Sequence, residues 1–190
     1  MRGERCLLRP LSQADAQVTL AWRNDPALRD AVMGYRFPVT QAREDAWYAR
    51  ILQDGGDRRA DYAIESLTDG AMVGMTHLAE IDWIARHAGF GIIIGDASRQ
   101  GRGLAAEAMR LLFGHAFGVL NLRRIHLRVA AYNVRALALY HRFGFREEGR
   151  LREHVFLNGR YHDLVLMGLM RADHATRVPD APAAEAPRTA

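Results

Sequence analysis

The chain of 190 residues contains no lysine, so all 26 of its basic residues are arginines. Without lysine it cannot form a Schiff base with pyridoxal phosphate or with a carbonyl substrate. The same absence excludes the P-loop nucleoside triphosphatases, whose phosphate-binding loop requires a lysine. The arginines are spread along the chain in runs of at most two, and the net charge is only +4. Nucleic acid is therefore not an expected partner.

Cysteine is almost absent as well. Cys6 is the only one, which excludes an intramolecular disulfide and any zinc site built from paired cysteines. It stands in a short apolar run (Cys6-Leu7-Leu8), so we expect a buried small hydrophobe in the first strand. No acetyl-enzyme intermediate is expected at this position.

Long apolar segments are missing too. No run approaches the roughly 18–20 apolar residues that span a bilayer. The N-terminus carries an acidic residue and no apolar stretch that would make a signal peptide. We therefore expect a cytoplasmic protein that does not enter the membrane. With 49% hydrophobic residues, the chain is long enough for one domain with a substantial core.

The hydrophobic period changes along the chain. The first part predicts a short strand and three helices, with Ser12 capping the first helix and Thr40 the third. From Tyr62 to Gly95 the period is that of antiparallel strands, with a hairpin turn at Asp69-Gly70.

The second half alternates helices and strands. Helices are expected at about 103–118 and from Val134 onward, and Asn158-Gly159 predicts a hairpin before a last apolar strand, Leu164–Met170. The expected fold class is α+β, with one domain over residues 1–171. An Ala/Pro-rich stretch without periodicity predicts a disordered tail over residues 172–190.

A glycine-rich turn separates the antiparallel strands from the next helix: Gln100-Gly101-Arg102-Gly103-Leu104-Ala105. Glycines let the backbone approach a ligand closely, and the free N–H groups at a helix N-terminus attract anions. The turn is neither a Rossmann fingerprint nor a Walker loop. By itself it indicates either an anion site suited to a pyrophosphate or a simple strand-to-helix turn.

Two motifs carry a resemblance to a known family. Gln100-x-x-Gly103-x-Ala105 is similar to the acyl-CoA signature of the GNAT acetyltransferase superfamily, and about 30 residues later the segment from Asn133 to Phe145 resembles the second motif of that superfamily. The resemblance covers roughly residues 5–171. It implies a GNAT-type mixed, mostly antiparallel sheet of about seven strands flanked by helices and splayed between the fourth and fifth strands.

The resemblance also implies acetyl-CoA as the co-substrate. The backbone of the strand before the turn would bind the pantetheine arm, and the turn would bind the pyrophosphate, flanked by Gln100 or Arg102. Asn133 would touch the pantetheine region, although asparagine is also a good helix N-cap. Arg135 would meet the adenosine phosphates or be a solvated surface charge. The implied cofactor-binding residues are Ile92, Ile93, Ile94, Gln100, Gly101, Arg102, Gly103, Leu104, Ala105, Asn133, Arg135 and Tyr140.

Tyr140 is the expected catalytic acid. The CoA thiolate leaves when an amine attacks the thioester, and a positioned hydroxyl can protonate it; the alternative for an aromatic residue at helical spacing is a place in the core. Many members of the family place a glutamate where this chain has Gly89. The candidate bases are therefore His77, Glu80 or Asp82 on the preceding strand, or a relayed water. Alternation along that strand predicts that Glu80 and Asp82 share one face with Met72 and Leu78.

The acceptor remains open between two kinds of primary amine. The motifs resemble both nucleotide-sugar amine acetyltransferases and ribosomal-protein alanine acetyltransferases. The first resemblance implies a small-molecule acceptor, a nucleotide-linked amino sugar, and the second implies a protein or peptide N-terminus. Arg23, Tyr35 and Phe37 are candidates for the acceptor side. A catalytically silent acyl-CoA-binding sensor or assembly module is the alternative. The apolar last strand is compatible with a homodimer that shares a sheet, or with simple burial.

Overall fold

The computed structural model describes residues 1–31, 37–53 and 57–175. Within these ranges the chain forms a seven-stranded sheet in the order β1-β2-β3-β4-β5-β7-β6, with helices packed against it. The elements are β1 Cys6–Pro10, the 3-10 turn η1 Gln13–Asp15, α1 Ala16–Asn24, α2 Pro26–Ala31, α3 Gln41–Gln53, β2 Ala60–Ser66, β3 Met72–Asp82, β4 His87–Ile94, η2 Ala97–Arg99, α4 Leu104–Gly118, β5 Arg124–Ala130, α5 Val134–Arg142, β6 Arg146–Leu157, β7 Arg160–Met170 and α6 Arg171–Ala175.

All strand pairs of the sheet are antiparallel except β4 with β5, which are parallel. That pairing lasts for only three residues and ends at Gly89, opposite His126. Beyond this point β4 continues to Ile94, still paired with β3, while β5 continues to Ala130, still paired with β7. The two strands therefore diverge, and the expected fold class and splayed sheet are confirmed.

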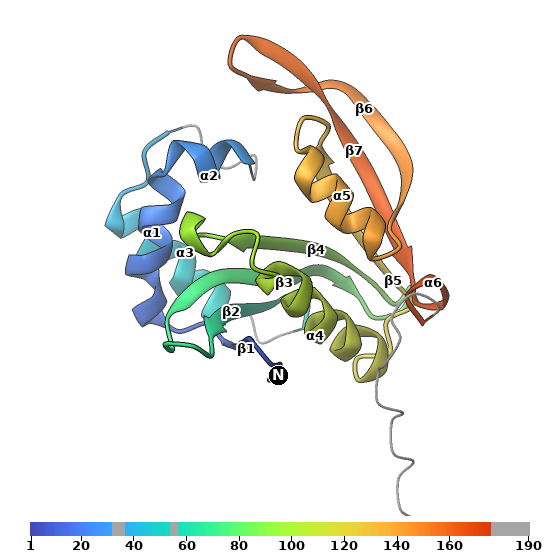
Figure 1. Ribbon diagram of the computed structural model, residues 1–190, viewed down its shortest axis with the longest axis horizontal. Coiled ribbons are helices and arrows are strands. Elements are labelled where there is room, and N and C mark those ends of the chain that lie inside the picture. Colours follow the sequence, from blue (N-terminus) through green and yellow to red (C-terminus); the bar gives the residue numbers. More distant parts are fainter. Residues whose placement is uncertain (32–36, 54–56, 176–190) are drawn as a thin grey trace, which may run out of the picture.

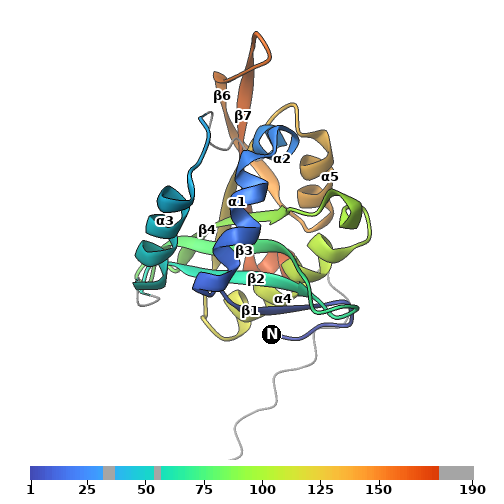
Figure 2. The same cartoon turned by 90° about the vertical axis from the view of Figure 1, so that its left-hand side faces the viewer.

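Helices cover both faces of the sheet (Figures 1 and 2). On β2, the neighbouring residues Ala63 and Ile64 are both fully buried but belong to different clusters. Ile64 packs in the main core with residues of α4 such as Met109, whereas Ala63 packs with Tyr48 of α3. Because successive strand residues point to opposite faces, the main core with α4 and α5 lies on one face and α3 lies on the other.

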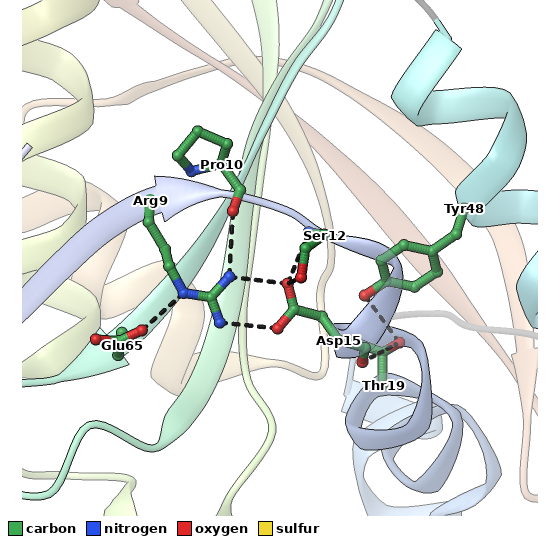
Figure 3. Close-up of polar contacts among 7 residues, drawn as sticks. All are labelled: Arg9, Pro10, Ser12, Asp15, Thr19, Tyr48 and Glu65. Atoms are coloured by element: carbon green, nitrogen blue, oxygen red, sulfur yellow. Dashed lines mark hydrogen bonds and ion pairs between the residues drawn. The ribbon is translucent and has the colours of Figure 1, made fainter.

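An arginine fixes the start of α1 against the sheet (Figure 3). Arg9 on β1 donates hydrogen bonds to both carboxylate oxygens of Asp15, at 2.8 and 2.9 Å, and to Glu65 of β2 at 2.7 Å. Asp15 in turn accepts hydrogen bonds from the backbone N–H and the hydroxyl of Ser12. The expected cap at Ser12 is thus part of a network that joins β1, β2 and the first helix. Bidentate arginine–carboxylate pairs of this kind restrict geometry as well as adding energy.

The alternation expected along β3 breaks down before the strand ends. A bulge lies between Ala79 and Asp82, and Glu80 has a positive φ of 52°. Leu78 and Ile81 are both buried as a result, whereas the side chain of Glu80 is 66% exposed. The prediction that Glu80 and Asp82 share the face of Leu78 is wrong, because a bulge inserts a residue and shifts every later side chain.

The C-terminal hairpin is longer than its apolar part. Asn158 and Gly159 both have positive φ, as a two-residue hairpin turn requires, and β7 begins directly after them. β7 pairs with β5 on one side and β6 on the other, so its apolar sequence is explained by burial within this chain rather than by a shared dimer sheet. The helix α6 runs to Ala175, beyond the expected domain end at residue 171; residues 176–190 lie outside the described part.

Two glycines on one face of β4 make room for large side chains. A methyl group on Gly91 would overlap the ring of His77, and one on Gly95 would overlap the indole of Trp22. His77 comes from β3 and Trp22 from α1. Glycine is therefore needed at both positions for close packing of a neighbour, not for an unusual backbone angle.

We predict that Gly95→Ala destabilises the protein by about 1–3 kcal/mol, because the rigid indole cannot move aside without repacking α1. Gly114→Ala is the matched control. An added methyl at this position in α4 meets nothing within 4 Å, so its helix propensity should stabilise the protein by about 0.5–1 kcal/mol. Urea unfolding of the three proteins measures both changes. Equal stability of Gly95→Ala and the parent protein would contradict the packing argument.

Burial of His77 predicts a pH dependence of stability. Burial, reinforced by the positive charge of Arg59, lowers the pKa of His77 from 6.5 to about 4, with Asp61 acting in the opposite direction. The unfolded chain binds a proton near pH 6.5 and the folded one only near pH 4. The contribution of His77 is therefore complete above pH 6.5 and is lost progressively as the pH falls from 6.5 to 4.

The comparison of parent protein and His77→Gln in urea unfolding at a series of pH values tests this. The parent should lose more of its free energy of unfolding between pH 6.5 and 4 than the variant does. Parallel pH profiles would show that His77 titrates normally.

Candidate active site

A cavity of about 870 Å³ lies where β4 and β5 diverge. Both strands contribute to its wall, together with α1, α2, β3, the glycine-rich turn and α5. Of the predicted site residues, the following line it: His77, Ile92, Ile93, Ile94, Gln100, Gly101, Gly103, Leu104, Ala105, Asn133, Arg135 and Tyr140. One cavity therefore brings together residues from two sequence motifs and from the strands between them.

The glycine-rich turn ends at the N-terminus of α4. Gly101 and Gly103 have φ values of +80° and +84°, and Gly103 is the N-cap of the helix. A side chain at Gly103 would also meet Arg5, whose Nη1 would lie 2.6 Å from the added Cβ. The turn thus needs glycine for backbone geometry, and the N–H groups of the first turn of α4 are available to an anion in the cavity.

Gln100 links the two sides of the turn. Its amide donates a hydrogen bond to the carbonyl of Ile94 at the end of β4, and its carbonyl accepts one from Arg135 of α5, both at 3.0 Å. Arg99 also lines the cavity and is paired with Asp69 and Asp96. Arg102, in contrast, is exposed and does not line the cavity. Arg135 and Arg99, rather than Arg102, adjoin Gln100 on the cavity side of the turn.

Asn133 holds two helices at once. Its carbonyl oxygen accepts a hydrogen bond from the N–H of Ala136 and caps α5, and its amide donates to the carbonyl of Ala31 at the end of α2. Tyr132 donates to the neighbouring carbonyl of Asp30. The capping role is therefore observed, and the same residue ties α2 to the rim of the cavity.

Tyr140 belongs to the hydrophobic core and also lines the cavity. Its ring packs edge-to-face against Phe90 at 6.3 Å and lies 5.7 Å from Phe145, and the residue lines the cavity. Burial raises the pKa of its hydroxyl to about 12. The hydroxyl therefore keeps its proton across the neutral range and is a donor, not a base.

Of the three candidate bases, only His77 lines the cavity. The exposed Glu80 lies outside it and faces Arg128 at 3.8 Å. Asp82 accepts hydrogen bonds from the N–H groups of Ile84 and Ala85 and belongs to the β3–β4 turn. Alternation alone would put both carboxylates on the face of Leu78, opposite that of His77, and the bulge in β3 moves Glu80 from there to the surface.

The other side of the cavity is formed by α1, α2 and α3. Arg23 lines it, lies 4.3 Å above the ring of Trp47, and pairs with the buried Glu44 at 2.5 Å. Phe37 is 74% exposed and does not line the cavity. Tyr35, the third residue expected on this side, lies outside the described residues.

Sequence reasoning missed five arginines of the cavity. Arg99 and Arg142 lie beside or within the two motifs, and the other three are Arg29 of α2, Arg59 before β2 and Arg128 of β5. Arg128 carried a usable signal, because it alternates with the buried Leu127 and Val129 and so had to point to the opposite face. Nothing in the local sequence marks the other two.

The described ranges also bear on metal binding and on membrane insertion. No group of three or more histidine, cysteine, aspartate or glutamate side chains able to hold a metal ion occurs there. No helix of this part of the chain is long and apolar enough to cross a membrane.

Comparison with known proteins gives a consistent family. The family model of the acetyltransferase (GNAT) domain matches residues 5–146. The spermidine N(1)-acetyltransferase of Escherichia coli (strain K12) is 34% identical over 176 residues, covering 89% of this chain and 90% of that protein. A Bacillus subtilis (strain 168) protein, provisionally named a ribosomal N-acetyltransferase, is 33% identical over 140 residues, covering 72% and 76%.

The structure gives the same answer. The crystal structure of spermidine N-acetyltransferase from Vibrio cholerae in complex with CoA and spermine superimposes with a TM-score of 0.81 at 29% identity, covering 90% of this chain and 98% of that one. The relatives are named for catalysed acetyl transfer, which sets aside the silent binding module. The narrower nucleotide-sugar or ribosomal branch is not confirmed. With its splayed sheet and its glycine-rich turn, the chain belongs to the GNAT acetyltransferases and is an acetyl-CoA-dependent N-acetyltransferase.

Proposed function

We propose that the protein acetylates a small-molecule primary amine, which enters the cavity from the side of α1 and α2 while acetyl-CoA occupies the splay. One observation carries the proposal: a single cavity is lined by the phosphate-binding turn, by Tyr140, and by side chains of α1 and α2. Its volume of about 870 Å³ is in the range of small-molecule sites.

Acetyl-CoA would be held by backbone as much as by side chains. The segment Ile92–Ile94 is not paired with β5, so its backbone groups can bind the pantetheine arm as an added strand would. The first turn of α4 would bind the pyrophosphate. Arg135 and Arg99 flank that turn and supply charge-assisted hydrogen bonds to phosphate oxygens.

In the proposed reaction the amine nitrogen attacks the thioester carbonyl carbon, a C–N bond forms and the C–S bond breaks. The hydroxyl of Tyr140 donates a proton toward the departing sulfur. His77 is neutral at pH 7 because its pKa is lowered to about 4. It is therefore a hydrogen-bond acceptor for the attacking amine, or for a water that carries the proton away.

A polyamine is a specific candidate acceptor. The relatives at 34% identity and the structural neighbour are named for spermidine, and that neighbour was solved with spermine. Spermidine is therefore the first acceptor to be assayed. A peptide N-terminus is not suggested by these names. A cytoplasmic location and a homodimer remain predictions.

We predict that Tyr140→Phe lowers kcat by about 10²-fold or more, the usual contribution of a positioned general acid, while the Kd for CoA changes little. The phenylalanine preserves the packing of the ring, so thermal unfolding should be nearly unchanged. Steady-state thiol release and CoA titration measure the two quantities. Full activity of the variant would remove the acid role of Tyr140.

Thiol release from acetyl-CoA across a panel of small amines tests the proposed function itself. At least one small primary amine should accelerate release well above the rate with no acceptor, and mass spectrometry should find the N-acetylated product. CoA binding without acceleration by any small amine would overturn the proposal.

A further inference from the structure

The charged side chains that line the cavity are positive. Among the described residues that line it are seven arginines and no aspartate or glutamate: Arg23, Arg29, Arg59, Arg99, Arg128, Arg135 and Arg142. Arg99 and Arg135 adjoin Gln100 at the phosphate-binding turn, so phosphates of acetyl-CoA account for them. The others need a different explanation.

Strand register places some of these arginines beside the expected position of the thioester. Asp61, His77 and Gly91 form a row across β2, β3 and β4. On β5, Arg128 lies two residues beyond His126, the last residue paired with β4, and so is level with Gly91 on the far side of the divergence. Gly91 contributes no side chain, and the ring of His77 lies directly over it on the side that faces Arg128 across the divergence.

The carboxylates of Asp61 and Glu80 pair with arginines of the cavity but do not line the cavity themselves. Asp61 forms a bidentate pair with Arg59 at 2.6 and 2.7 Å, and its side chain is almost buried. Glu80 is outside the cavity and meets Arg128 only at 3.8 Å. A cationic ligand in the cavity would therefore meet guanidinium N–H groups instead of carboxylate oxygens.

Arg29 and Arg128 are two cavity arginines with unused hydrogen-bonding capacity. The Nε atom of Arg29 is buried without a hydrogen-bond partner in the described part of the molecule, and its ion pair with the adjacent Asp30 is long, at 3.8 Å. Arg128 has its side chain 58% exposed next to the divergence. A buried donor without a partner is costly, and an anionic ligand group would satisfy it.

We propose that the acceptor amine carries a carboxylate or phosphate group, bound by Arg29 and Arg128, so that the cavity selects zwitterionic or anionic amines over polyamines. This rests on the proposed small-molecule acetyl transfer and narrows its substrate class. His77, being neutral, adds no charge of its own. Guanidinium groups bind both kinds of anion in a forked geometry, so the tests must distinguish carboxylate from phosphate.

Two matched pairs of amines isolate the charge of the distal group. 4-Aminobutanoate is compared with 1,4-diaminobutane, and O-phosphoethanolamine with ethylenediamine. The anionic member of at least one pair should have a kcat/KM about 10-fold or more above its diamine, and which pair shows it identifies carboxylate or phosphate. A preference for the diamines in both pairs, or for spermidine over every anionic amine, would overturn the proposal.

Substitutions then assign the preference to residues. Arg128→Gln and Arg29→Gln should each lower the ratio of kcat/KM for the anionic amine to kcat/KM for the diamine by about 10-fold, mainly through the KM of the anionic amine. Arg128→Lys should restore part of it. Arg50→Gln is the control, because Arg50 lies exposed on α3 and does not line the cavity. An undiminished preference in both glutamine variants would contradict the assignment.

Direct binding separates failure of this inference from failure of the proposed function. Calorimetric titration of the CoA-saturated protein with the same four amines requires no turnover. Tighter binding of the anionic amines, lost in Arg128→Gln, supports the charge selection even if no amine is acetylated. Tighter binding of the diamines, or binding of none of the four, overturns it.

Discussion

The parting of β4 and β5 is the constraint on which the rest of the molecule depends. Two parallel strands pair for three residues and then separate, although each keeps its other neighbour to the end. Backbone groups of β4 are thereby presented toward the gap, and a buried backbone group needs a partner. An extended pantetheine arm offers such groups at strand spacing. The cofactor site proposed here would thus be a consequence of incomplete sheet pairing.

The divergence is stabilised from both sides by different means. On one face, Phe90 packs against Phe113 at 4.9 Å and against Tyr140, so an aromatic cluster joins β4 to α4 and α5. On the other face, glycines at 91 and 95 allow His77 and Trp22 to lie directly on the strand. Large side chains on one face and glycines at 91 and 95 on the other let this segment carry part of the core on one side and part of the cavity wall on the other.

The lysine-free composition has a consequence inside the cavity. Arginine stays charged when partly buried, whereas lysine shifts its pKa readily. Pairs such as Arg23–Glu44 and Arg59–Asp61 keep the carboxylate behind and the guanidinium in front. Such pairs hold the guanidinium groups in place, and an array of fixed cationic donors favours a ligand group of negative charge. Membership of the family indicates acetyl-CoA as the acetyl donor, and the inference about the charge of the acceptor rests on the arginines of the cavity.

The sequence by itself determined what depends on local spacing. The turn at Asn158-Gly159, the caps at Ser12 and Asn133, the glycine-rich turn at the start of α4 and the placement of Tyr140 on α5 all follow from residues a few positions apart. Two motifs in the right order were enough to indicate acetyl-CoA. The sequence could predict these features because turn geometry, helix capping and the face of a helix depend on residues that are close together in the chain.

Only the tertiary structure decided which side chains meet. The bulge after Ala79 moves Glu80 off the face of Leu78 and to the surface, and no periodicity predicts a bulge. Arg29, Arg59 and Arg128 come from three elements far apart in the chain, and only the packing of α2 and the divergence of β5 bring them to one cavity. Sheet register and helix docking are long-range, so the sequence alone could indicate the glycine-rich turn and the second motif but not the arginines that line the other side of the cavity.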